Sequence, residues 1–290
     1  MRALFEPGFF ASTPVRTALV VGAIVALASG VIGVLTVIRS QSFSGHALGD
    51  VGTVGGSAAF LANVSPLWGF LGIAVLASGT MELFGVERRR GRDVATGVVL
   101  GAALGLSALL LYFDTTSTST SGAAVTILFG SLFTVSSDLL PALAGLGGGV
   151  LGAVLVMYRP LLLSSVSSEL AAANGLPVRF LGVAFLVMTG IGVSLSALAV
   201  GTILSTALLI GPAAAALRLT RRPGRAMLAA GASGLAATWL GILLAYDSFY
   251  WPPARKGWPV SFFVVALVLV FYVGSGSLSS ARSRRARGTT

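Results

Sequence analysis

Cysteine is absent from the sequence and charged residues are scarce. Without cysteine the chain can form no disulfide, no thiolate metal site and no dithiol redox couple. Charged residues make up 10% of the 290 positions, against about 25% in an average soluble domain. Hydrophobic residues reach 55% and the mean hydropathy is +0.93. A soluble protein of this length could not cover its surface with so few charges, so we expect a polytopic membrane protein.

Two sequence patterns are also missing. The apolar runs are about 20 residues long rather than alternating segments of about ten, which excludes a membrane β-barrel. The phosphate-binding pattern GxxxxGK[ST] does not occur, so any use of ATP must come from another subunit. The fold class that remains is an all-α membrane protein.

Apolar runs long enough to cross a bilayer recur along the chain and predict eight or nine transmembrane helices. We expect one transmembrane domain over 1–290, with a helical core at about 15–278 and a basic tail at 279–290. The first run continues unbroken to residue 38, so we read it as a retained helix rather than a cleaved signal peptide. The span at 44–61 is weak and interrupted by glycines, and the apolar segment 122–135 is short enough to be re-entrant or interfacial. The expected spans are 15–38, 44–61, 66–84, 94–113, 138–158, 178–198, 201–217, 226–246 and 260–273.

The formal net charge of +10 comes from basic clusters in short connections and at the C-terminal end. These clusters are "ERRRGRD" (87–93), "RLTRRPGR" (218–225) and "ARSRRAR" (281–287). Their distribution is typical of the positive-inside pattern of a plasma or inner-membrane protein, not of nucleic-acid binding. We therefore expect the basic side and the C-terminus to be cytoplasmic and the N-terminus to lie outside.

One stretch, "FSGHALGDVGTVGG" (43–56), places the only histidine close to a carboxylate inside an apolar chain. Four positions apart on a helix, His46 and Asp50 would share one face. Imidazole nitrogen and carboxylate oxygen at this spacing can bind one divalent cation such as zinc or manganese. A buried charge in a bilayer is costly, so the pair should face a cavity or each other. The alternative is a hydrogen bond that fastens two helices, and the spacing alone does not decide between the two.

Five stretches in order resemble the membrane permease subunit of ATP-binding cassette (ABC) systems for zinc and manganese uptake, over about 30–275. The last of them is the most specific and is similar to that family's pattern V-G-x-x-L-x-x-A-L-L-I-x-P-A-A-x-A. They are "RSQSFSGHALGD" (39–50), "GRDVATGVVLGAALGLSALLL" (91–111), "ILFGSLFTVSSDLL" (127–140), "LLSSVSSELAAANGLPV" (162–178) and "VGTILSTALLIGPAAAALRLTRRP" (200–223).

The chain departs from the family pattern at two places. The family has the carboxylate first and the histidine four residues later, whereas His46 precedes Asp50 here. The shared helix face survives this exchange, although the order in which an ion meets the two groups changes. In the loop 162–178 the usual aspartate is replaced by Ser167 or Ser168, which leaves Glu169 as the acidic residue.

The resemblance implies a homodimeric permease with the ion pathway along its two-fold axis. Its partners would be a cytoplasmic ATP-binding subunit and an extracytoplasmic metal-binding lipoprotein or periplasmic protein. No cofactor would be bound permanently, because the divalent metal is the cargo and the chain itself is not an enzyme. The implied metal ligands are His46 and Asp50. The implied ATPase-coupling loop contains Ser167, Ser168, Glu169, Asn174 and Gly175, and residues of the pathway or its helix packing are Gly45, Gly49, Gly211 and Pro212.

Three other functions fit parts of the sequence. A permease for siderophores or corrinoids would need a cavity for a bulky ligand and would make no use of a histidine–carboxylate pair. A self-sufficient cation/proton antiporter would use Asp50 as its proton carrier and would work without an ATPase. A membrane scaffold would use the pair only to join helices. Among zinc, manganese and iron, the sequence does not choose.

Overall fold

The computed structural model describes the chain except residues 1–7, 86–91, 118–121, 131, 252–256 and 288–290. Among the described residues every regular element is helical, as expected. The elements are η1 (Phe9–Ala11), α1 (Thr13–Ile38), α2 (Ser42–Leu61), α3 (Pro66–Gly85), α4 (Arg92–Ser117), α5 (Ala123–Phe129), η2 (Leu132–Thr134), η3 (Ser137–Leu139), α6 (Leu140–Val166), α7 (Ser168–Ala173), α8 (Val178–Val200), α9 (Thr202–Leu219), α10 (Pro223–Ser248) and α11 (Val260–Arg287).

Six helices in the described part are long and apolar enough to cross a bilayer: α1, α6 with η3, α8, α9, α10 and α11. Two shorter apolar stretches, 66–81 and 100–116, lie in α3 and α4. The remaining long helix, α2, is rich in glycine and carries the histidine and aspartate, which lower its hydropathy. The prediction of an all-α membrane protein is confirmed, with six clear apolar spans and two shorter apolar helices among the described residues.

The glycine-rich span forms one continuous helix, α2, although the sequence left open whether it breaks. The short apolar segment behaves as expected, because α5 has only seven residues and ends at Gly130. That length is far below the roughly 20 residues that a spanning helix needs. At the C-terminal end, α11 continues to Arg287, well past the apolar part of the helix.

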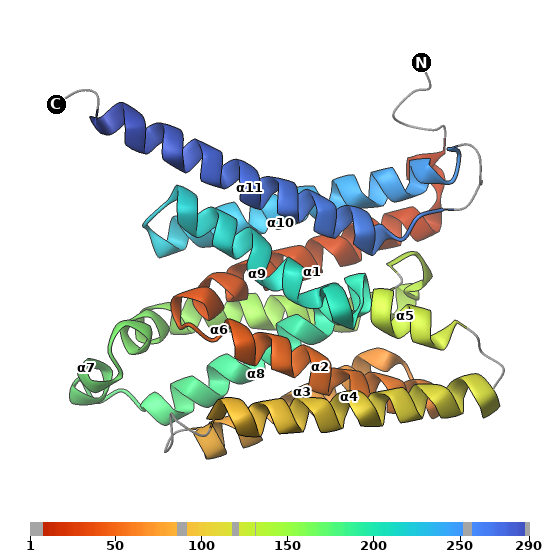
Figure 1. Cartoon of the computed structure of the whole chain (residues 1–290), viewed down its shortest axis with the longest axis horizontal. Coiled ribbons are helices and arrows are strands. Elements are labelled where there is room, and N and C mark those ends of the chain that lie inside the picture. Colours follow the sequence, from red (N-terminus) through yellow and green to blue (C-terminus); the bar gives the residue numbers. More distant parts are fainter. Residues whose placement is uncertain (1–7, 86–91, 118–121, 131, 252–256, 288–290) are drawn as a thin grey trace.

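The helices form a bundle in which α1 and α8 are the most buried of the spanning helices (Figure 1). α1 packs against α6, α8, α9 and α10, and α11 covers α9 and α10. On the other side, α2 packs against α3 and α4 and also contacts α8 and α9. α2 thus joins the α3–α4 pair to the rest of the bundle.

Glycines allow the closest helix contacts. A Cβ atom on Gly55 of α2 would collide with the carbonyl oxygen of Gly69 of α3, and the reverse also holds. Such backbone-to-backbone contact is typical of helix packing in membranes, where small residues let helices approach. At the α8–α9 joint, Gly201 has a φ of 84° and lies against Gly130, whose φ is 74°. Both positions need glycine because they combine left-handed backbone with direct backbone contact.

Candidate metal centre

The candidate centre begins with two side chains of α2. Because α2 is an unbroken helix, residues four apart lie on the same face, one turn from each other. His46 Nε2 lies 3.4 Å from Asp50 Oδ2. The predicted proximity of the imidazole and the carboxylate is therefore present in the structure.

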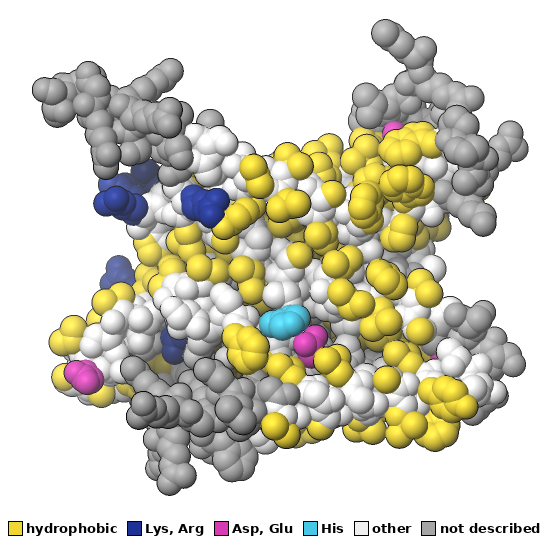
Figure 2. Space-filling model, in the orientation of Figure 1, with side chains coloured by type: hydrophobic (Ala, Val, Ile, Leu, Met, Phe, Trp, Pro, Cys, Tyr) yellow, Lys and Arg dark blue, Asp and Glu magenta, His cyan; other side chains and the backbone are white. Residues whose placement is uncertain are grey.

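The pair lies on an open face of the protein rather than in its core. The side chain of His46 is 44% exposed and that of Asp50 is 15% exposed. Figure 2 shows the histidine and the neighbouring acidic side chain near the middle of this face, while the basic side chains lie toward one end of the molecule. Within a bilayer, a polar pair on this face would have to meet a water-filled pathway or another protein chain, since lipid would leave the carboxylate unsolvated.

A third side chain contacts the histidine from another helix. His46 Nδ1 lies 2.9 Å from the hydroxyl oxygen of Thr206, in the second turn of α9. The two ring nitrogens therefore have different partners, a carboxylate on α2 and a hydroxyl on α9. Sequence reasoning missed Thr206, because 160 positions separate it from His46 and an isolated threonine in an apolar helix gives no signal.

Small residues bring α2 close enough to its neighbours for this contact. A Cβ atom on Gly45 would lie 3.1 Å from Leu209 Cδ2, and one on Gly49 would lie 3.2 Å from Val193 Cγ1 and 3.3 Å from Ser205 Oγ. Both glycines are buried. The structure thus places Gly45 and Gly49 in the packing of α2 against α8 and α9, directly beside the candidate centre.

The geometry suits a shared ion, although one chain supplies an incomplete ligand set. Two atoms bound at about 2.1 Å to a tetrahedral ion are about 3.4 Å apart, and zinc usually takes four such ligands. His46 Nε2 and Asp50 Oδ2 have this separation. No cluster of three or more histidine and acidic side chains suitable for a metal exists among the described residues. An ion bound here would need further ligands, such as oxygen atoms of water or of other groups nearby, or side chains of a second chain.

The predicted coupling loop forms a short helix at the end of the molecule where the basic side chains gather. α7 is connected to α6 through Ser167, whose hydroxyl oxygen accepts the backbone N–H of Leu170 at 3.1 Å. Ser168 and Glu169 lie in its exposed first turn. The helix ends at Asn174 and Gly175, the latter with a φ of 74°. These five residues thus lie together in one short segment, more than 100 positions in the sequence after the His46–Asp50 pair.

The sequence analysis predicted two other residues of α9, Gly211 and Pro212, to take part in the pathway or its helix packing. A Cβ atom on Gly211 would collide with Val268 of α11, so glycine lets these helices approach. Pro212 is buried within α9, which remains helical through it. Gly211 thus contributes to the packing of α9 against α11, while Gly45 and Gly49 border the candidate centre.

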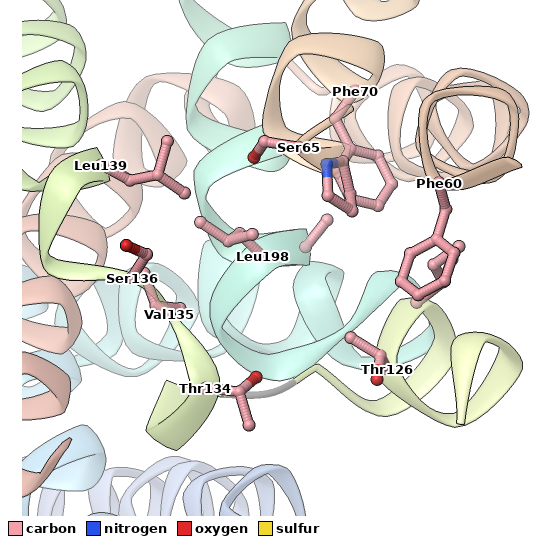
Figure 3. A pocket seen from close by; sticks show the side chains of 12 residues that line it. Phe60, Ser65, Phe70, Thr126, Thr134, Val135, Ser136, Leu139 and Leu198 are labelled. Atoms are coloured by element: carbon pink, nitrogen blue, oxygen red, sulfur yellow. The ribbon is translucent and has the colours of Figure 1, made fainter. Parts of the chain in front are cut away.

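A separate cavity of about 250 Å³ lies among α2, α3, α5, α8 and the segment before α6 (Figure 3). Hydroxyl groups of Ser65, Thr126, Thr134 and Ser136 line it together with apolar side chains such as Phe60 and Phe70. Its lining includes neither histidine nor a carboxylate. The cavity is therefore distinct from the candidate centre and lacks the histidine and carboxylate ligands expected of a manganese or zinc site.

Comparison with known proteins gives consistent matches over most of the chain. The manganese transport system membrane protein MntC of Listeria innocua is 30% identical over 244 residues, which cover 84% of this chain and 85% of that protein. The manganese import system permease protein ScaB of Streptococcus parasanguinis is 28% identical and covers 80% of this chain and 81% of its own length. Among solved structures, PsaBC from Streptococcus pneumoniae, in complex with Fab, matches with a TM-score of 0.76 and 24% identity over 92% of both chains.

The family comparison extends over nearly the whole helical bundle. A model described as the ABC 3 transport family matches residues 12–274, which includes every helix from α1 to α10 and about the first half of α11. This match, with the relatives above, also confirms the expectation that the chain is a membrane permease subunit rather than an ATPase. The chain therefore belongs to the ABC 3 transport family.

Proposed function

We propose that this protein is the membrane permease of an ATP-driven importer for a divalent metal ion, and that it works as a homodimer. The observation that carries the proposal is the His46–Asp50 pair, 3.4 Å apart on an exposed face, in a chain of the ABC 3 transport family. The curated relatives MntC and ScaB are named as manganese systems. Manganese is therefore the proposed cargo, with zinc and iron as the competing ions.

A second copy of the chain would complete the centre. One chain offers two ligand groups, and a two-fold arrangement of the exposed α2 faces would bring two histidines and two carboxylates together. Four such groups match the usual ligand number of zinc and leave water positions free for manganese, which prefers a larger shell. A weak site also suits transport, because the ion has to leave again.

The energy would come from a separate cytoplasmic ATPase that docks on α7. Leu170 and Val166 support this role, since they are 57% and 80% exposed beside the capped helix. Exposed apolar side chains on a short, well-capped helix are suited to contact a soluble partner. The basic side chains gather at this same end of the molecule (Figure 2), which supports a cytoplasmic location of α7 and of the C-terminus. A metal-binding lipoprotein or periplasmic protein would deliver the ion at the opposite end.

Metal content of cells tests the proposal directly. We would grow a deletion strain under chelation, complement it with wild-type, His46→Ala or Asp50→Asn protein, and measure manganese, zinc and iron by elemental mass spectrometry. We expect deletion to lower manganese and both variants to import it at least about tenfold more slowly, because loss of a ligand costs no less than loss of an outer-shell partner. Asp138→Asn, an exposed carboxylate outside the centre, is the matched control and should restore uptake.

The outcome also separates the competing functions. Unchanged metal levels on deletion would contradict metal import, and full rescue by His46→Ala at normal abundance would reduce the pair to a helix contact. Uptake by purified protein in liposomes without any ATPase, driven by a pH gradient, would instead support an antiporter. A fall in cellular zinc or iron rather than manganese would show that the imported ion is zinc or iron, and the proposed ATP-driven import would still stand.

A further inference from the structure

The imidazole of His46 is held between two partners on different helices. Its Nε2 faces the Asp50 carboxylate at 3.4 Å, and its Nδ1 lies 2.9 Å from Thr206 Oγ1. Thr206 is half-buried on α9, at the contact that Gly45 and Gly49 make possible. A nitrogen that binds a metal needs a free lone pair, so what the other nitrogen bonds to determines whether the ring can bind.

A hydroxyl group is suited to this position because it can reverse its role. When Nε2 binds a metal ion, the ring proton is on Nδ1 and is donated to Thr206 Oγ1. When the site is empty, Nε2 can carry the proton and face the carboxylate of Asp50. Nδ1 then needs a donor, which the Thr206 hydroxyl supplies after rotating about its C–O bond. A carboxylate or backbone carbonyl in this position could only accept a hydrogen bond from Nδ1. It would therefore keep the ring proton on Nδ1, the tautomer that binds metal through Nε2, even when the site is empty.

We propose that Thr206 is a positioning residue that pairs with His46 Nδ1 in both the loaded and the empty state, so that the ring can bind the ion and also release it. The inference rests on the proposed function, because it assumes that His46 Nε2 is a metal ligand. It adds a residue outside α2 to the centre. It also links the state of the centre to α9, the helix that carries the most specific sequence match.

The single histidine makes a direct test possible. Full-length protein in lipid nanodiscs, labelled with ¹⁵N-histidine and purified through an affinity tag that contains no histidine, gives ring-nitrogen signals from His46 alone. The probe is Zn²⁺, which is closed-shell and leaves the spectra sharp. We expect the proton to be on Nε2 in the empty protein and on Nδ1 after Zn²⁺ is added, with the Nε2 signal shifted by the metal.

Three variants complete the test. Thr206→Val keeps the shape of the side chain and removes the hydroxyl, and should weaken Zn²⁺ binding by about 10- to 100-fold, the usual effect of losing an outer-shell partner. Thr206→Ser restores the hydroxyl and should bind as the wild type does. Thr80→Val removes an exposed hydroxyl on α3 that bonds to Ala77, and should have no effect. Metal uptake in cells should follow the same order.

The results separate the two proposals. If Zn²⁺ leaves the ring signals of the wild-type protein unchanged, His46 is not a ligand and the proposed function itself fails at this site. If the wild-type ring responds while Thr206→Val binds Zn²⁺ with unchanged affinity and the same ring tautomers, only the role of Thr206 is overturned. Should Thr206→Val fail to fold, the wild-type spectra still decide, because a proton on the same nitrogen in the empty and loaded states contradicts the inference.

Discussion

Arg39 has structural contacts in addition to the topological role that its position in the sequence predicts. From the sequence, the positive-inside pattern predicts only a basic residue at the cytoplasmic end of the first span. In the structure its guanidinium donates to the hydroxyls of Ser164 and Ser165, at 3.1 and 3.4 Å, and lies 4.7 Å from the centre of the Phe185 ring. Arg39 thus joins the turn before α2 to the end of α6, just ahead of α7.

A single hydroxyl also stabilises the start of α7. Ser167→Ala removes the acceptor for the Leu170 N–H and should destabilise this helix by about 1 kcal/mol, as loss of an N-cap usually does. Hydrogen–deuterium exchange of the α7 amides should then become about fivefold faster, since 1.4 kcal/mol corresponds to tenfold. Ser167→Asp keeps a capping oxygen and should exchange as the wild type does. Equal exchange in all three proteins would show that the cap does not stabilise α7.

At the scale of helices, contact between α2 and α3 depends on the absence of side chains. Transmembrane helices gain little from the hydrophobic effect when they associate inside a bilayer, so packing and hydrogen bonds must hold them together. Gly55 and Gly69 supply the packing between α2 and α3. Hydrogen bonds between hydroxyl groups join other helices. For example, the hydroxyl oxygens of Ser29 on α1 and Ser196 on α8 are 2.6 Å apart.

Gly55→Ala tests the packing of the helix that carries the candidate centre. The new methyl group would meet the backbone of Gly69, which cannot move aside as a flexible side chain can. We expect a loss of about 1–3 kcal/mol or more, the range for overpacked sites, measured as a lower thermal midpoint in detergent. Gly72→Ala is the control on α3, because its added Cβ would meet no atom within 4 Å. A midpoint that falls equally for both variants would contradict the argument.

At the scale of the whole molecule, the exposed face around His46 is the surface where a second copy is proposed to bind. The native chain contains no cysteine, so one introduced thiol reports on one position. Phe43 is 50% exposed and lies one turn before His46 on α2. Phe43→Cys should therefore give an oxidant-dependent homodimer in native membranes, detected as a band of doubled mass on non-reducing gels.

A second exposed position serves as the control for cross-links that form when proteins collide at random in the membrane. Leu228→Cys places a thiol on α10, at a residue that is 75% exposed, and should give little cross-linked dimer. If this variant cross-links as efficiently as Phe43→Cys, the bands reflect random encounter. If neither variant cross-links at any oxidant concentration, a dimer through the face of α2 is contradicted.

The amino-acid sequence by itself determined the membrane environment and the helical class, and it predicted that His46 lies close to Asp50 wherever 44–61 is helical. These follow from composition, run length and spacing within one helix, all of which are local. The sequence also favoured a re-entrant or interfacial segment at 122–135 over a spanning one, and the seven residues of α5 agree with this. Only the tertiary structure decided that α2 stays unbroken, since its glycines have neighbouring helices to pack against. It alone placed the Thr206 hydroxyl beside the His46 ring, because contacts between distant segments arise from the packing of whole helices.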